Sequence, residues 1–228
     1  MSIGKLSLLY MFLLSCAVSL IQCSSLSKEE RWVEQRLRNM SVREKVGQMI
    51  AIPGSIARYD TSTEYRTEIE RWVTDYNIGA AFINFGTVDQ TVHMINALQN
   101  LAETPLLFWS GGLAHTTVWG STQFPQSMAF TANGSLEDIF EAGRIVGKEG
   151  RVMGFHYNGG PVVDVNINPE NPIINIRSFS EDPEMVTDMA EAFIRGARES
   201  GIICAAKHFP GHGDTFLDSH LALPVVDA

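Results

Sequence analysis

Short apolar runs alternate with amphipathic segments along most of the chain. The runs that we expect to be strands lie at Met49–Ile52, Ala80–Phe85, Leu106–Trp109, Val152–Phe155, Val162–Val165 and Ile202–Lys207. Runs of this length, bounded by turn residues, are typical of strands that are buried on both faces. Such strands occur in parallel sheets covered by helices, so the pattern predicts an α/β fold.

The amphipathic segments between these runs predict helices. They cover Glu29–Arg38, Thr63–Asn77, Asp89–Leu101, Leu136–Gly147 and Pro183–Ser200. Ser41 and Glu44 have the spacing of a capping box that opens a further helix, and Pro183 suits the first position of its helix. Gly79 ends the helix that precedes the second strand. This alternation allows either a doubly wound sheet or a (β/α)8 barrel.

Residues 1–23 have the composition of a targeting segment, because one basic residue, Lys5, precedes a long apolar run. Two cleavage modes fit: a signal peptidase cuts after the small residues Ala17–Ser19, or a lipoprotein signal is cut before Cys23, whose thiol is then lipidated. An uncleaved anchor helix is the third option. We therefore expect a secreted, periplasmic or outer-membrane-anchored lipoprotein, with a possible lipid anchor at Cys23.

The composition is that of a globular protein. Hydrophobic residues make up 45% and charged residues 19% of the 228 residues, and this length can bury a sizeable core. The net charge of −9 disfavours nucleic acid as a partner. Cys16 and Cys23 fall in the targeting segment, so Cys204 is the only certain thiol of the mature part and no disulfide framework is expected. Without repeats or linkers, residues 24–228 are expected to form one domain.

Titratable residues are most concentrated in one stretch, Lys207–His220, which reads Lys-His-Phe-Pro-Gly-His-Gly-Asp-Thr-Phe-Leu-Asp-Ser-His. Pro210 excludes a helix, and Gly211 and Gly213 permit backbone angles that other residues avoid. The stretch follows an apolar run, so it is expected to be a loop at the end of a strand. Catalytic residues are commonly placed on such loops.

Asp218 and His220 are the most specific pair within this loop. An aspartate two residues before a histidine can hold one ring nitrogen and fix the tautomer. The other nitrogen is then available to exchange a proton with a substrate. A lone Asp-x-His triplet is more often a solvated turn, so the surrounding motif decides between the two interpretations.

A metal site is the rival chemistry for the same loop. The potential ligands are His208, His212, Asp214, Asp218 and His220. The spacing of His208 and His212 would suit zinc on a helix, but Pro210 and Gly211 remove that helix. We therefore expect neither a metal nor another cofactor.

The whole string resembles the signature loop of glycoside hydrolase family 3, in its bacterial β-N-acetylglucosaminidase branch. This resemblance implies a (β/α)8 barrel and a retaining exo-glycosidase that acts on O-glycosyl bonds of peptidoglycan fragments or chitooligosaccharides. It also implies that His220 is the general acid and base and that Asp218 orients it. Lys207 and His208 would hydrogen-bond sugar hydroxyls, which makes a carbohydrate the expected partner.

A second block resembles the same family. It consists of Asp164–Pro169 followed by Arg177–Pro183. The resemblance implies that Arg177 contacts the sugar; the alternative is an exposed arginine in a surface ion pair. Asp164, at the end of an expected strand, either shapes the pocket or orders the asparagine-rich loop that follows.

Two departures from the family pattern matter. Ser110–His115 stands where the family places an acidic pair that grips the sugar, and losing such charge-assisted hydrogen bonds costs a few kcal/mol, about 1.5–3 for each. The family's nucleophilic aspartate follows a later strand, beyond Ala228. We therefore expect a barrel incomplete at its C-terminus, with the missing segment exposing apolar sheet surface. The alternatives are an inactive carbohydrate-binding remnant, a β-glucosidase or a glycoside phosphorylase.

Overall fold

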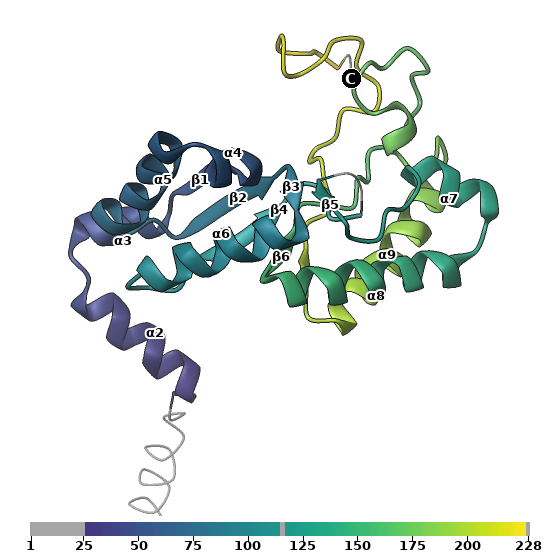
Figure 1. Ribbon diagram of the computed structural model, residues 1–228. Helices are drawn as coiled ribbons and strands as arrows, with labels where there is room; N and C mark the ends of the chain where they lie inside the picture. The colour runs from purple at the N-terminus through teal and green to yellow at the C-terminus, as the bar shows by residue number, and fades with distance from the viewer. Residues whose placement is uncertain (1–25, 115–116, 227–228) are drawn as a thin grey trace, which may run out of the picture. The chain divides into compact units, whose positions relative to one another are not determined.

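The computed structural model describes residues 26–114 and 117–226 (Figure 1). The chain divides into two compact units, Met1–Lys45 and Val46–Ala228. The expected targeting segment, with Cys23, lies outside the described residues. The prediction of one domain over residues 24–228 stays a prediction. None of the described helices is long and apolar enough to span a bilayer.

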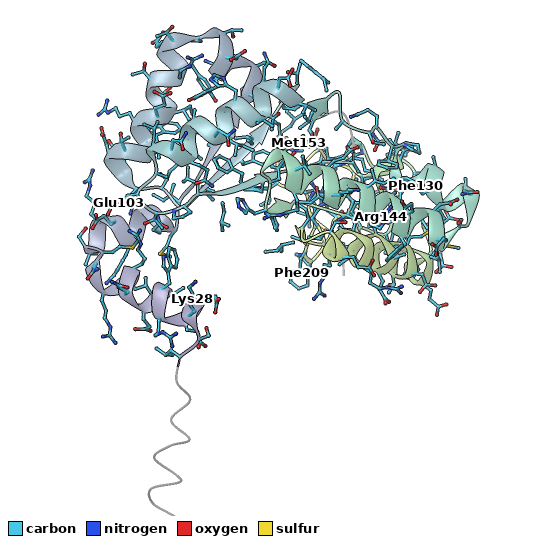
Figure 2. All side chains as sticks on the ribbon, turned by 60° about the horizontal axis from the view of Figure 1, so that its bottom comes forward. Lys28, Glu103, Phe130, Arg144, Met153 and Phe209 are labelled. Carbon is cyan, nitrogen blue, oxygen red and sulfur yellow. The ribbon has the colours of Figure 1, made fainter. Side chains whose placement is uncertain are left out.

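Capping side chains open the first two described helices, α2 (Lys28–Asn39), whose first residue is labelled in Figure 2, and α3 (Val42–Gln48). Ser27 and Glu30 form a complete capping box at α2. At α3, the Glu44 backbone N–H donates to Ser41 Oγ at 3.3 Å, and the Ser41 N–H donates to Glu44 Oε2 at 2.7 Å. The capping box predicted from Ser41 and Glu44 is therefore confirmed.

The second unit is built on a parallel five-stranded sheet. Its strands are β1 (Ala51–Ser55), β2 (Ala80–Asn84), β4 (Leu107–Ser110), β6 (Tyr157–Asn158) and β7 (Ile203–Cys204). Their order in the sheet is β1-β2-β4-β6-β7, so each strand is added beside the previous one. In a doubly wound sheet the order of the strands reverses at a switch point, whereas in a barrel each strand lies next to the one before it in the sequence. The order is that of a (β/α)8 barrel and confirms the predicted fold class.

A two-stranded sheet accompanies the main one. It pairs β3 (Gly86–Thr87) with β5 (Val118–Trp119). The register of the main sheet places Ser55 beside Asn84 and Ser110 beside Asn158. Because all the strands run parallel, these polar residues gather at the carboxyl ends of the strands, which is the edge where the candidate site lies.

Helices occupy most of the connections between strands. They are α4 (Ile56–Thr61), α5 (Thr63–Tyr76), α6 (Val88–Leu101), α7 (Ser127–Asn133), α8 (Leu136–Met153) and α9 (Pro183–Glu199), with a 3-10 turn η1 at Asn175–Arg177. Figure 1 shows α8 and α9 lying side by side. A Cβ added at Gly196 would lie 2.0 Å from the Phe140 carbonyl oxygen, and one at Gly143 would lie 2.2 Å from that of Phe193. The two helices therefore pack closely against each other at these glycines.

The core fills one face of the sheet. Strand residues such as Ala81, Ile83 and Phe108 are fully buried, as are Ile69 of α5 and Leu98 of α6. On the other face, Leu107 is 56% and Ile203 62% exposed. The expectation that the strands are buried on both faces is therefore wrong for β4 and β7, whereas the expected exposure of apolar sheet surface is observed.

Two predicted strands are wrong. Val152 and Met153 belong to α8, whose buried positions continue at helical spacing past Gly147 until Gly154 ends the helix with φ +100°. Val162–Val165 forms only a single bridge, between Val162 and Lys207. Pro161, which precedes it, has no N–H to donate to a sheet.

The strand that fills this place in the sheet is β6, and the periodicity of the sequence did not reveal it. Tyr157 pairs with Trp109 of β4 on one side and with Ile203 of β7 on the other. A two-residue strand carries too short a pattern to be recognised from alternation. The short helices α4 and α7 escaped prediction for the same reason.

Candidate active site

A cavity of about 220 Å³ lies at the carboxyl ends of the strands. Its lining combines residues of the strand ends and the following loops with residues of α7 and α9. Gly111, Asn158, Arg177 and Lys207 are among the lining residues. Active sites of barrel enzymes lie at this end of the strands, so the position fits an active site.

Two cations reach the cavity, Lys207 and Arg177. The Lys207 ammonium donates to the Gly111 carbonyl oxygen at 2.9 Å, and Arg177 Nη1 donates to the Ile173 carbonyl oxygen at 2.7 Å. The pKa of Lys207 lies below its usual value, first because burial disfavours the ammonium and second because Arg177 is close, while Asp164 acts in the opposite direction. The two side chains therefore line one cavity and act on each other electrostatically.

Asp164 is the anchor of the loop that follows Lys207. Its Oδ2 accepts from the His208 backbone N–H at 3.1 Å and lies 2.6 Å from His208 Nδ1. Its Oδ1 accepts from the His212 backbone N–H at 2.8 Å. Burial raises the pKa of Asp164, but the hydrogen bonds from His208 and His212 outweigh burial and hold the pKa below its usual value. A buried carboxylate therefore fixes both ends of the segment.

The asparagine-rich loop supports the same segment from the other side. Asn171 Nδ2 donates to the His212 carbonyl oxygen at 2.7 Å, and Asn168 Nδ2 donates to that of Thr215 at 3.2 Å. A Cβ at Gly213 would lie 1.8 Å from the Val165 carbonyl oxygen, so only glycine fits this approach. In Figure 1 the yellow C-terminal segment runs beside the green segment that carries η1. The structure therefore gives Asp164 and the loop after it a joint positioning role.

Asp218 and His220 form a separate and local pair. His220 Nδ1 lies 2.7 Å from Asp218 Oδ1, which also accepts from the His220 backbone N–H at 2.9 Å. The hydrogen bonds from His220 hold the pKa of Asp218 below its usual value. The His220 side chain is 72% exposed, and neither residue lines the cavity. Nδ1 engages the carboxylate and Nε2 faces away from it, as proton transfer to a ligand requires.

The group that comes nearest to a metal site is Asp164, His208 and His212. One ligand atom of each lies within 4.8 Å of the others. The Nδ1 to Oδ2 distance of 2.6 Å is nevertheless that of a hydrogen bond, because two ligand atoms on a tetrahedral zinc lie roughly 3.3 Å apart at the usual bond lengths. Asp214, Asp218 and His220, the other potential ligands, are not part of this group.

The place of the family's acidic pair is occupied by neutral groups. Ser110 is fully buried, and its hydroxyl donates to Asn84 Oδ1 at 2.6 Å. Gly111 offers only its carbonyl, which accepts from Lys207. Outside residues 115–116, which the structure does not describe, the lining of the cavity contains no aspartate or glutamate.

The structure brings some of the predicted residues together and leaves others apart. Lys207 and Arg177 line the cavity, while His208 turns to Asp164 and the pair of Asp218 and His220 lies elsewhere on the loop. The sequence left two roles for Asp164, which were to shape the pocket or to order the asparagine-rich loop. Its carboxylate instead holds the segment from His208 to His212.

Among the lining residues that sequence reasoning missed, Asn158 is the most deeply placed polar one. Asn158, at the end of β6, is 2% exposed and lines the cavity. Its Oδ1 accepts from the Leu113 backbone N–H at 3.2 Å, which fixes the chain after β4. The available signal was an asparagine after an apolar run, but that run was predicted to be a strand, whereas Val152 and Met153 belong to α8 and the strand is Tyr157–Asn158.

Comparison with known proteins places these features in context. The family described as "Glycosyl hydrolase family 3 N terminal domain" matches residues 41–228. "Beta-hexosaminidase A" of Pseudoalteromonas piscicida is 37% identical over 175 residues, which are 70% of this chain and 29% of that protein.

Solved structures give the same result. A glycoside hydrolase family 3 β-N-acetylglucosaminidase from Paenibacillus sp. str. FPU-7 superposes with a TM-score of 0.73 at 32% identity, covering 82% of this chain and 36% of that one. The β-glucoside phosphorylase BglX, bound to 2FGlc, also gives 0.73, at 29% identity over 86% of this chain and 35% of that one. The chain thus spans about a third of the length of these relatives.

Proposed function

Because the chain belongs to glycosyl hydrolase family 3, we propose that it forms the sugar-binding and acid/base part of a retaining exo-β-N-acetylglucosaminidase. The observation that carries this proposal is the loop Lys207–His220. It starts with a lysine in the cavity and ends with a histidine oriented by a carboxylate. The relative named "Beta-hexosaminidase A" supports an acetamido sugar as the substrate.

The residues have distinct tasks in this proposal. Lys207 and Arg177 hold sugar oxygens in the cavity, and His208 is positioned beside them by Asp164. His220 donates its proton through Nε2 to the oxygen that leaves with the aglycone, and Asp218 stabilises the imidazolium before that step. Because His220 does not line the cavity, the loop that carries it has to approach the bound sugar.

Retaining hydrolysis also needs a carboxylate that attacks the anomeric carbon from the opposite side. Asp164 is unsuited to this task, because both of its oxygens are engaged by His208 and His212. The lining of the cavity, as far as it is described, offers no other acid. This observation favours a second candidate for the chain by itself, namely carbohydrate binding without turnover. A β-glucosidase or a phosphorylase is the alternative for the complete active site, and BglX supports the latter.

Sugar binding tests the proposal directly. We expect N-acetylglucosamine to bind the purified chain with a Kd in the range of about 1 mM, as measured by isothermal titration calorimetry. Arg177→Ala should weaken binding roughly tenfold or more, because a charge-assisted hydrogen bond contributes about 1.5–3 kcal/mol.

Arg71→Ala is the matched control, since Arg71 pairs with Asp75 on α5 and does not line the cavity. It should bind the sugar as the parent does. Equal loss in both variants, or undiminished binding in Arg177→Ala, would refute the assignment of the cavity as the sugar site.

Export of the protein is proposed on the basis of the sequence alone. Residues 1–23 have the pattern of a signal peptide or lipoprotein signal. Radiolabelled palmitate incorporation that is lost in Cys23→Ser would support the lipoprotein form, and cleavage before residue 23 without lipid would refute it.

A further inference from the structure

The described lining of the cavity carries positive charge and no negative charge. Lys207 and Arg177 are the charged residues of its described lining, and both are cations. The ammonium has three N–H donors, and the hydrogen bond to the Gly111 carbonyl uses one of them. Burial and then Arg177 lower the pKa of Lys207, and Asp164 acts in the opposite direction from outside the cavity lining.

Asp164, the carboxylate that acts on Lys207, adds no negative charge to the lining of the cavity. Asp164 does not line it, and its Oδ1 and Oδ2 accept the hydrogen bonds from His212 and His208. The carboxylate is therefore directed into the loop. Ser110 and Gly111, at the end of β4, contribute a buried hydroxyl and a carbonyl but no negative charge.

We propose that the cavity accepts a sugar that carries a negatively charged group, a carboxylate or a phosphate, held between Lys207 and Arg177. The inference rests on the proposed function, since it takes the cavity to be a sugar site. Arginine and lysine recognise carboxylate and phosphate through charge-assisted hydrogen bonds, which are shorter and stronger than those to neutral hydroxyls. A volume of about 220 Å³ is below the ~300–1,000 Å³ of pockets for drug-sized ligands, which suits a single sugar ring.

Paired monosaccharides test the charge preference. Glucuronate and glucose 6-phosphate are compared with glucose by calorimetry at low salt, and the two anions separate a carboxylate from a phosphate. We expect at least one of them to bind tenfold or more tightly than glucose and to lose that advantage as the salt concentration rises. Lys207→Gln should reduce the preference for the anion.

Gly111→Asp provides the sharper test. A Cβ at Gly111 would lie 4.0 Å from Lys207 Nζ and 3.3 Å from the Phe82 ring, so a small shift of the ring would place a carboxylate beside the ammonium. This variant should lose the preference for anions, whereas Gly111→Asn, which has the same shape without the charge, should retain it. Circular dichroism of both variants verifies that they fold.

The outcomes separate this inference from the proposed function. Equal affinity for glucose and for both anions, with N-acetylglucosamine still bound and lost in Arg177→Ala, would overturn the charge preference and leave the sugar site intact. Inorganic phosphate that binds as tightly as glucose 6-phosphate would overturn it as well, because the site would then recognise the anion without the sugar. Absence of binding for every sugar would overturn both.

Discussion

Two histidines of one loop each pair with an aspartate at almost the same distance, but the two pairs have opposite surroundings. Nδ1 lies 2.6 Å from the carboxylate in the pair of His208 and Asp164, and 2.7 Å in the pair of His220 and Asp218. Asp164 has a fully buried side chain and comes from another segment, 44 residues away. Asp218 is only two residues from its histidine, whose side chain is 72% exposed.

The difference shows that the distance within such a pair does not define its role. A buried carboxylate that accepts three hydrogen bonds from two points of a loop holds the backbone in place. An exposed pair between neighbours fixes little beyond its own turn, and surface pairs contribute about 0–1 kcal/mol. The buried pair is therefore suited to position Lys207, and the exposed pair to exchange a proton.

Replacing Asp164 should give the largest effect on stability. We expect Asp164→Ala to lower the free energy of unfolding by about 2–4 kcal/mol, because it leaves the N–H groups of His208 and His212 without their acceptor in a buried place. Urea unfolding followed by circular dichroism measures this difference.

Asp218→Ala is the control for that measurement. It removes the same side chain from the exposed pair, and it should change the free energy of unfolding far less than Asp164→Ala does. Equal effects of the two substitutions would show that the pairs do not differ in the way their burial indicates.

Asn171 extends the comparison of stability effects to a neutral side chain that supports the same loop. Its side chain donates to the His212 carbonyl oxygen and accepts from the N–H groups of Ile173 and Ile174. Asn171→Ala should cost about 1–2 kcal/mol, less than the loss of Asp164, because neutral hydrogen bonds are weaker. Asn133→Ala, at an exposed helix end, should have no comparable effect in the same urea titration, and a loss as large as in Asn171→Ala would contradict the assigned support of the loop.

At acid pH, Asp164 should no longer contribute to the free energy of unfolding. The folded-state pKa of this residue is lowered, so its stabilisation is fully present above the unfolded value of about 3.9 and is lost as the pH falls through the folded value. The difference in stability between the parent and Asp164→Asn should therefore shrink below about pH 4. Urea titrations from pH 6 to pH 2 measure this trend, and a difference that grows in acid would contradict it.

The sequence revealed local features and failed at distant ones, for physical reasons. The pair of Asp218 and His220 was readable because the two residues are neighbours, as was the capping box of Ser41 and Glu44. The contact of Asp164 with His208 depends on how two separate segments meet, and no local pattern encodes it.

The same limit explains the errors in the fold. Regular runs such as β2 and α5 were predicted nearly at their observed bounds. Val162–Val165 has the composition of a strand, yet only Val162 pairs, with Lys207. A strand forms only where a neighbouring segment provides hydrogen-bond partners along its length. The parallel sheet and its barrel-like order followed from the alternation together with the family resemblance.

The most direct test of the central claim, that His220 is the proton donor of this loop, uses two leaving groups. Phenyl and 2,4-dinitrophenyl β-N-acetylglucosaminides are offered to the chain with added azide, which attacks the anomeric carbon in place of a protein carboxylate. The phenolate of the first substrate needs a proton to leave, whereas the dinitrophenolate does not.

We predict that His220→Ala lowers cleavage of the phenyl glycoside by about 10²–10⁴-fold and leaves the dinitrophenyl glycoside nearly unchanged, since general acid catalysis acts only on the poor leaving group. The control His93→Ala removes another exposed histidine with an aspartate partner, Asp60 at 3.2 Å, and should affect neither substrate. Equal rates for the parent and His220→Ala on the phenyl glycoside would contradict the account.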